Sequence, residues 1–316
     1  MPPPDTARSK PMTLGLNLPY VEGSMDGATP RWADILAMAR TAETIGLDAV
    51  WVSDHLGFGD PDGEWHGAWE SWTLLSALAA STSRARLGTY VTAAPLRNPA
   101  LLAKMAETLD EVSGGRVVLG LGAGWNEPEY RAFGVAFDHR FDRFEDALRI
   151  ITSLLRTGRA DYDGPYAQAR GARLEPRGPR PSGLPVMVGA AGPRMLRLAA
   201  ELADEWNAGM RTPDELRPLV AAVDEACAAV GREPATLTRS AEVLVRTVAD
   251  DAPGPAGAAG ARPPGERELR GTPEAIAAAL RRYADLGMSH LQVQLRPDTP
   301  AAVEALAPVV QLLAGS

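Results

Sequence analysis

The 316-residue sequence predicts an α/β fold, a (β/α)8 TIM barrel. Short apolar segments alternate with longer amphipathic segments, and this order is typical of a parallel sheet. Eight such apolar segments can be counted. They read as continuous apolar runs, which indicates strands that are covered on both faces. A barrel of this kind needs about 250 residues, so the chain has room for insertions as well.

The eight predicted strands follow one another along the whole chain. They cover residues 12–18, 49–54, 86–93, 116–124, 184–191, 204–209, 240–247 and 290–295. A doubly wound open sheet would also alternate strands and helices, but it usually has fewer strands. The G-x-G-x-x-G fingerprint of dinucleotide-binding sheets is absent, which favours the barrel.

Three of the intervening helices have clear start signals. Asn98 and Pro99 are a typical N-cap and first helical residue, and Thr272 and Pro273 repeat the pattern near the C-terminus. A third helix is predicted to begin after Asp138, where apolar residues recur at helical spacing. These signals place helices after the third, fourth and seventh strands.

Two segments are predicted to be insertions in the barrel. Residues 161–183 precede the fifth strand, and residues 250–271 follow the seventh. The second is so rich in Gly, Ala and Pro that we expect a mobile loop. Residues 1–11 are expected to be a disordered leader, which makes residues 12–316 a single barrel domain.

Composition narrows the partners and the location. The net charge is −8 with a pI of about 5.2, and no basic cluster stands out, which argues against nucleic acid and anionic membranes as partners. No apolar run approaches the ~18 residues of a membrane span. Cys227 is the single cysteine, so no disulfide framework can form, and the N-terminus lacks the apolar core of a signal peptide. We expect a cytoplasmic protein.

Asp54 and His55 stand where the second strand ends, in "WVSDHL". The carboxyl ends of barrel strands face the active site, and histidine can exchange a proton near neutral pH. Asp54 could orient His55 or raise its basicity. A purely structural histidine is the alternative. The other histidines, His66, His139 and His290, are scattered, so no metal site is predicted.

Tryptophans are the second feature of the predicted mouth. Trp65, Trp69 and Trp72 follow the second strand, and Trp125 follows the fourth. Near strand ends they indicate the wall of a pocket for a planar organic group. The alternative is ordinary packing in the core or at its rim.

Two glycine-rich segments end strands. Gly120, Gly122 and Gly124 form G-x-G-x-G, which fits either close packing within a strand or backbone approach to a flat ligand. After the fifth strand, small residues form a turn and Pro193 opens a helix. Exposed N–H groups at such a helix start can bind an anion, to which Arg194 could add charge. The residues of this turn are Gly189, Ala190, Ala191 and Gly192.

Taken in order, these segments resemble the bacterial luciferase-like superfamily, and most of all its branch that depends on the deazaflavin coenzyme F420. The resemblance covers roughly residues 12–315. It lies in "WVSDHL", "SGGRVVLGLGAGWNEPEY", "DHRFDRFEDALRIITSLL" and "PVMVGAAGPRMLRLAAELADEWN". It implies a (β/α)8 barrel with the cofactor ring at its C-terminal mouth.

The resemblance also implies roles for residues. The ring would lie in front of a bulge after the third strand, with Tyr90–Val91 as the candidate for a non-proline cis peptide. His55, accompanied by Asp54, would be catalytic, and Trp65 and Trp69 would contact the substrate. The implied cofactor-binding residues are Thr89, Tyr90, Val91, Gly122, Trp125, Asn126, Gly189, Ala190, Ala191 and Gly192.

One departure concerns the substrate. Sugar-phosphate dehydrogenases of this family have a glutamate where this chain has Trp125, which argues against that substrate class. The resemblance leaves three functions open. The first is hydride transfer between F420 and a small organic substrate. The second is an FMN-dependent monooxygenase that uses O2 and a separate flavin reductase. The third is a non-catalytic flavin-binding protein, against which the polar residues at the mouth argue. A homodimer is expected.

Overall fold

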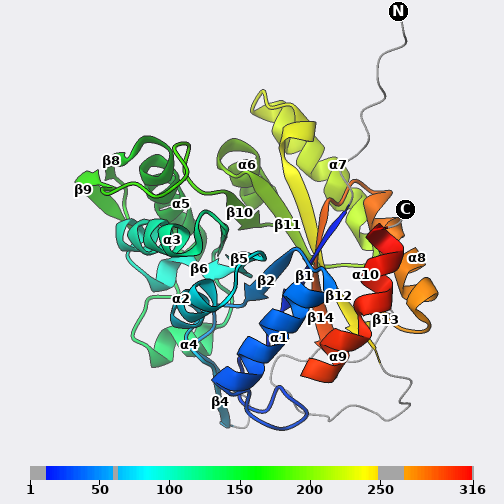
Figure 1. Cartoon of the computed structure of the whole chain (residues 1–316). Helices are drawn as coiled ribbons and strands as arrows, with labels where there is room; N and C mark the ends of the chain where they lie inside the picture. The colour runs from blue at the N-terminus through cyan, green and yellow to red at the C-terminus, as the bar shows by residue number, and fades with distance from the viewer. Residues whose placement is uncertain (1–11, 60–62, 248–266, 315–316) are drawn as a thin grey trace, which may run out of the picture.

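The computed structural model describes residues 12–59, 63–247 and 267–314. Within these residues, eight parallel strands close into a barrel, and helices surround it (Figure 1). The predicted fold class is therefore confirmed. The barrel closes where β10 pairs with β7. In barrel order the strands are β1 (Thr13–Asn17), β2 (Ala49–Val52), β5 (Arg86–Thr89), β7 (Val117–Gly122), β10 (Val186–Gly189), β11 (Glu205–Met210), β12 (Thr238–Arg246) and β14 (His290–Arg296).

Side chains alternate between two cores along each strand, which is why the strands read as apolar runs. Leu16 and Val50 belong to the large core between barrel and helices. Trp51 and Met187 belong to a smaller cluster inside the barrel. A Cβ on Gly88 would lie 2.2 Å from the Trp51 ring, so the glycine makes room for that large side chain. Burial on both faces is what fixes these segments as strands.

The helices that cover the barrel begin where the sequence signals predict. The Asn98 side chain accepts a hydrogen bond from the Leu101 N–H, and that of Thr272 accepts one from the Ala275 N–H. The helices are α1 (Trp32–Ile45), α2 (Ser71–Ser81), α3 (Pro99–Ser113), α4 (Glu127–Ala132), α5 (Arg140–Thr157), α6 (Pro193–Leu202), α7 (Pro213–Ala229), α8 (Pro273–Ala284), α9 (Pro300–Ala305) and α10 (Ala307–Ala314).

Two antiparallel hairpins are added to the barrel. β3 (Gly57–Gly59) and β4 (Trp65–Gly67) lie in the loop after β2. β8 (Arg159–Asp163) and β9 (Gln168–Arg173) form within the insertion before β10 and project beside α5 (Figure 1). The short strands β6 (Thr92–Ala93) and β13 (Glu268–Leu269) pair with β7 and β12.

Two expectations fall outside the described residues. These are the leader over residues 1–11 and most of the loop over residues 250–271. In the part of the chain that the structure describes, no helix is both long enough and apolar enough to cross a membrane.

Candidate active site

Three strand ends converge on Val91 at the mouth of the barrel. The peptide bond between Tyr90 and Val91 is cis, at the position that the resemblance implied. A Cβ on Gly122 would lie 2.7 Å from Val91 Cγ2, and one on Gly189 would lie 3.5 Å from the same atom. The Thr89 hydroxyl donates to the Gly120 carbonyl at 2.7 Å. The structure therefore brings together these predicted cofactor-binding residues of β5, β7 and β10.

His55 is held by a carboxylate from another part of the chain. Its Nδ1 lies 2.9 Å from Oε1 of Glu129, a buried residue of α4. The other oxygen, Oε2, accepts the Leu56 N–H at 2.9 Å. With a carboxylate at Nδ1, that nitrogen carries the proton in the neutral ring and Nε2 is left as the acceptor. Among the described residues, Nε2 has no hydrogen-bond partner.

Aromatic rings enclose His55 on two sides. The Phe58 ring centroid lies 4.6 Å from that of His55, and the Trp125 centroid lies 5.3 Å away in an edge-on arrangement. Trp125 is 62% exposed, an unusual degree for so large an apolar side chain. Asn126 is buried and donates from Nδ2 to the Gly57 carbonyl at 2.8 Å, which ties the hairpin to the end of β7.

Asp54 has different partners from those expected. It is 1% exposed and receives two hydrogen bonds from the Arg97 guanidinium, at 2.6 and 2.9 Å. The Ser71 hydroxyl donates to it at 2.6 Å. The expected contact between Asp54 and His55 is absent from these described interactions, and Glu129 stands in its place. Adjacent residues at a strand end point to opposite sides, which separates the two side chains.

The tryptophans of the loop after β2 are not gathered around His55 as a wall. Trp72 is 3% exposed and belongs to the core under α2. Trp69 donates its indole N–H to the Pro30 carbonyl at 2.8 Å and is 45% exposed. Trp65 packs against its own hairpin, since a Cβ on Gly57 would lie 2.4 Å from its ring. Trp125 is the tryptophan that the structure places beside His55.

The turn after β10 has the small residues that an anion site requires. Ala190 is fixed by its N–H, which donates to the Asn207 carbonyl, and by its carbonyl, which accepts the Trp206 indole N–H at 2.8 Å. Ala191 and Gly192 are exposed at the start of α6.

Arg194 is not free to serve this turn. Its guanidinium lies 2.6 Å from an Asp142 oxygen and 2.8 Å from a Glu145 oxygen. Two carboxylates thus neutralise the charge that the sequence suggested for the anion site, which leaves backbone N–H groups as the donors.

A carboxyl inside the barrel mouth was not singled out from the sequence. Glu242 of β12 accepts hydrogen bonds from Asn17 Nδ2 at 2.9 Å and from the Tyr90 hydroxyl at 3.3 Å. Burial raises its pKa to about 7, against the opposing effect of these two donors. The sequence does contain a signal for Glu242, because it is an acid in the middle of the otherwise apolar strand "SAEVLVRT".

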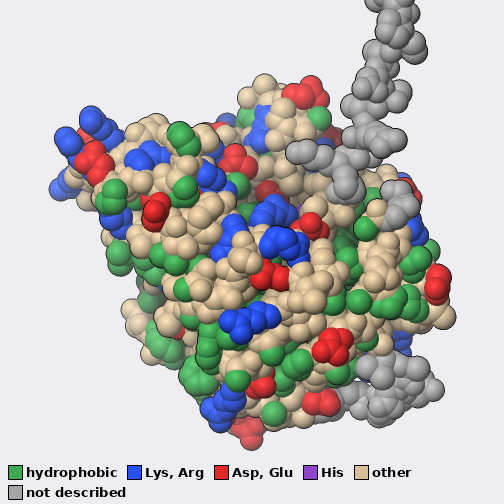
Figure 2. Space-filling view, in the orientation of Figure 1, with side chains coloured by type: hydrophobic (Ala, Val, Ile, Leu, Met, Phe, Trp, Pro, Cys, Tyr) green, Lys and Arg blue, Asp and Glu red, His purple; other side chains and the backbone are tan. Residues whose placement is uncertain are grey.

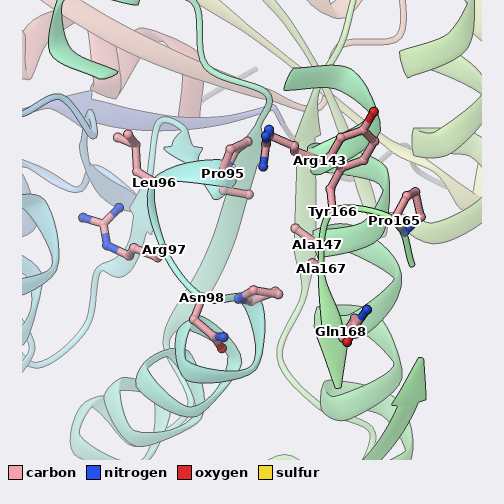
Figure 3. A pocket seen from close by; sticks show the side chains of 12 residues that line it. Pro95, Leu96, Arg97, Asn98, Arg143, Ala147, Pro165, Tyr166, Ala167 and Gln168 are labelled. Atoms are coloured by element: carbon pink, nitrogen blue, oxygen red, sulfur yellow. The ribbon is translucent and has the colours of Figure 1, made fainter. Parts of the chain in front are cut away.

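A cavity of about 500 Å³ opens beside the mouth, between the start of α3 and the β8–β9 hairpin. Its walls include Arg97, Asn98, Arg143 and Tyr166 (Figure 3). The Arg143 guanidinium lies 4.9 Å from the centre of the Tyr166 ring. Arg97 lines this cavity and also binds Asp54, so the cavity lies next to the residue at the end of β2. It does not include His55.

The described residues contain no group of three or more His, Cys, Asp or Glu side chains that could hold a metal ion. On the face shown in Figure 2, acidic and basic side chains are mixed, with apolar side chains between them.

Comparison with known proteins assigns the family. Residues 12–253 match the model of the luciferase-like monooxygenase family, so the chain belongs to that family. The curated relatives of the chain include both monooxygenases and a reductase.

Two curated relatives represent these two activities. The chain is 34% identical over 247 residues to pyrimidine monooxygenase RutA of Methylobacterium radiotolerans, which is 72% of this chain and 64% of that protein. It is 32% identical over 193 residues to 5,10-methylenetetrahydromethanopterin reductase of Archaeoglobus fulgidus, or 61% of this chain and 54% of that protein. The matches therefore span less than two thirds of these relatives.

Solved structures share the fold over almost the whole chain. An F420-dependent secondary alcohol dehydrogenase in complex with an F420–acetone adduct superposes with a TM-score of 0.81, at 20% identity, over 96% of this chain and 99% of that one. A riboflavin lyase with modified FMN and riboflavin gives a TM-score of 0.77, at 17% identity, over 96% and 92%. At such identities the likeness establishes the fold alone.

Proposed function

We propose that this protein is an F420-dependent oxidoreductase that moves a hydride between the deazaflavin and a small organic substrate at the barrel mouth. The pair formed by His55 and Glu129 is the observation that carries the proposal. Hydride removal from an alcohol carbon requires that the hydroxyl proton leave to a base. Nε2 of His55 faces no protein partner in the described residues, and Glu129 fixes the tautomer that can accept that proton.

The predicted cofactor-binding residues would suit a flat ring with a phosphate-bearing tail. The deazaflavin, when bound, supplies the carbon that accepts or donates the hydride. Val91, flanked by Gly122 and Gly189, would form a small-residue surface behind the ring. Thr89 and Tyr90 would complete that surface. Trp125 would line one side and Asn126 would keep the hairpin in place.

The turn after β10 would hold the phosphate. Gly189 and Ala190 place the chain, and Ala191 and Gly192 expose backbone N–H groups at the start of α6, where the helix dipole favours an anion. Trp65, on the β3–β4 hairpin, would meet the substrate from that side, whereas Trp69 is bound to the Pro30 carbonyl. Asp54, through Arg97, would position the loop that carries His55.

The proposal is tested by incubating the protein with oxidised F420 and a panel of small alcohols, and following the loss of deazaflavin absorbance. We expect reduction with at least one alcohol. The variant His55→Ala should react about 10²- to 10⁴-fold more slowly, as expected on loss of a general base. Equal rates for the variant and the wild-type protein would overturn the role of His55.

A second function, an FMN-dependent monooxygenase, is favoured by the 34% identity to a pyrimidine monooxygenase. It requires reduced FMN from a separate flavin reductase, O2, and a water-excluding site. Exposed Trp125 and half-buried Phe58, beside His55, would supply apolar cover for such a site. Substrate-dependent O2 uptake with FMN, NADH and a reductase, and none with F420, would establish this alternative.

Two further expectations belong to this proposal. We expect a homodimer, for which a solution mass near 33.5 kDa would be contradictory. We also expect a cytoplasmic protein that acts on small molecules. If neither cofactor binds, the proposal fails as a whole. If a cofactor binds and no panel member turns over, a non-catalytic flavin-binding role gains support.

A further inference from the structure

One carboxyl points into the barrel from the middle of a strand whose neighbouring residues point outward. On β12, Ala241 and Val243 pack in the core between barrel and helices. Side chains alternate along a strand, so Glu242 between them faces the barrel interior. The register sets Glu242 beside Met210 and Gln292, near the carboxyl end of β11. It therefore belongs to the floor of the mouth.

Only neutral groups bind this carboxyl in the described structure. Asn17 Nδ2 donates to Oε1 at 2.9 Å, and the Tyr90 hydroxyl donates to Oε2 at 3.3 Å. Two other acids near the mouth are held differently. Asp54 pairs with the Arg97 guanidinium, and Glu129 binds a backbone N–H as well as His55. Glu242 thus differs from Asp54 in having no cation among its described partners, and it differs from Glu129 in having no backbone donor among its described side-chain contacts.

The surroundings of Glu242 have opposing effects on its pKa. Burial raises its pKa to about 7, and the donors Asn17 and Tyr90 lower it again. Burial, followed by the charge of Glu242, raises the pKa of Tyr90 well above its ordinary value, so the phenol stays a neutral donor. Arg211, on the adjacent strand end, has an opposing effect on Tyr90. Tyr20 is buried, and its pKa is likewise raised, chiefly by burial.

Asn17 can serve both states of the carboxyl. Its Oδ1 is buried and lacks a hydrogen-bond partner among the described residues. Rotation of the amide by half a turn would exchange Nδ2 for Oδ1 opposite Glu242. The amide can then donate to the carboxylate or accept the O–H of the protonated acid. An orphaned buried acceptor is costly, so it indicates a group that acquires a partner in another state.

We propose that Glu242 is a second acid–base group of the active site, which gives its proton to, or takes it from, a nitrogen or oxygen of the molecule bound at the mouth. In one direction the O–H bond of Glu242 breaks, a bond forms between the proton and the ligand atom, and the carboxylate remains with Asn17 and Tyr90 as its donors. The other direction is the reverse. Asn17 and Tyr90 are positioning residues.

The barrel order separates this group from His55. Strands β14 and β1 stand between β12, which carries Glu242, and β2, which His55 follows. The two groups therefore approach the mouth from different sides, and one can remove a proton while the other supplies one. The inference rests on the proposed function for the identity of the bound molecule, but the exchangeable proton can be measured without any ligand.

The first test is infrared difference spectroscopy of the unliganded protein as a function of pH. We expect the C=O stretch of a protonated carboxyl that disappears with a midpoint near pH 7 and is missing in Glu242→Gln. Asp163→Asn, a change in the exposed pair with Arg170, is the control and should keep the band. Burial also raises the pKa of Glu205 and Asp298, so bands from these carboxyls should remain in both variants. A transition near pH 7 that is unchanged in Glu242→Gln, or a midpoint near the ordinary 4.5 of glutamate, would overturn the proposal.

The variant Tyr90→Phe keeps the test decisive if Glu242→Gln does not fold. It removes a donor that favours the charged carboxylate, so the midpoint should move to higher pH. An unmoved midpoint would show that the titrating carboxyl is not the one bound to Tyr90, and the proposal would fail.

The second test asks whether the bound molecule touches Glu242. The dissociation constants of oxidised F420 and FMN are measured from pH 6 to 8. If a ligand shifts the pKa of Glu242, its affinity for the wild-type protein should depend on pH. The change should be up to ~10-fold over the titration for each pKa unit of the shift. The variant Glu242→Gln should lose this pH dependence. Superimposable profiles would overturn the contact. Failure of both ligands to bind would instead count against the proposed cofactors, while the infrared test still decides on Glu242.

Discussion

Glu129 determines what His55 can do. Its carboxylate receives the imidazole at 2.9 Å and the Leu56 N–H at 2.9 Å, so both oxygens are used. A carboxylate in this position selects one tautomer and stabilises the imidazolium that forms when the ring takes up a proton. The residue that orients His55 therefore comes from α4, whereas adjacent Asp54 binds Arg97 and Ser71.

Replacing Glu129 should separate these roles. Glu129→Gln preserves the shape of the side chain but removes the charge, and we expect kcat/KM to fall by at least ~10²-fold because the base loses its support. Glu127→Gln, two residues earlier in an exposed pair with Arg131, is the matched control and should retain full activity. Equal activities for the two variants would refute the assignment of Glu129.

The sequence allowed prediction of His55 but not of its partner. His55 follows an apolar strand, and the barrel places every strand end at the mouth. Glu129 is 74 residues away, and its contact with His55 depends on how α4 packs against the β3–β4 hairpin. Neither periodicity nor spacing carries that information. Glu242 did leave a signal, since an acid within a strand covered on both faces needs a reason.

At the scale of elements, Asp54 and Arg97 join three segments below the mouth. Asp54 follows β2, Arg97 follows the short 3-10 helix η1 (Ala94–Leu96), and Arg97 also binds Glu70, the N-cap of α2, at 2.7 Å. The Asp54 side chain is fully buried and that of Arg97 is 14% exposed. Removal of one member leaves the other charge buried without its main partner.

We therefore expect Asp54→Asn to lower the free energy of unfolding by ~3–5 kcal/mol, measured by urea denaturation. Asp163→Asn, in the exposed pair with Arg170, should lower it by less than ~1 kcal/mol. Similar small losses in both variants would contradict a supporting role for Asp54.

The strands were predictable because burial on both faces leaves a strong apolar signature. The β8–β9 hairpin was not, because its residues are largely polar and exposed, as in the β9 segment "QARGAR". Edge hairpins of this kind are stabilised by their pairing with each other and by contact with α5, which local composition does not reveal. Local sequence likewise does not show which way a loop tryptophan points. Trp72 packs in the core and Trp69 binds the Pro30 carbonyl, although both were expected in the wall of the pocket.

At the scale of the whole molecule, the barrel gathers a histidine, a half-buried acid and a small-residue surface at one end. His55 with Glu129 comes from one side, Glu242 with Tyr90 from another, and Val91 lies between glycines of β7 and β10. Solved structures that share this fold include one with an F420–acetone adduct and one with modified FMN, so the proposed function depends on which cofactor this chain binds.

The most direct measurement is a parallel titration of the purified protein with oxidised F420 and with FMN, followed by tryptophan fluorescence. We predict tighter binding of F420, with quenching that is largely lost in Trp125→Phe because Trp125 stands beside His55 at the mouth. Preference for FMN would contradict hydride transfer to a deazaflavin and favour oxygen chemistry. Binding of neither would contradict the assignment of this mouth as a cofactor site.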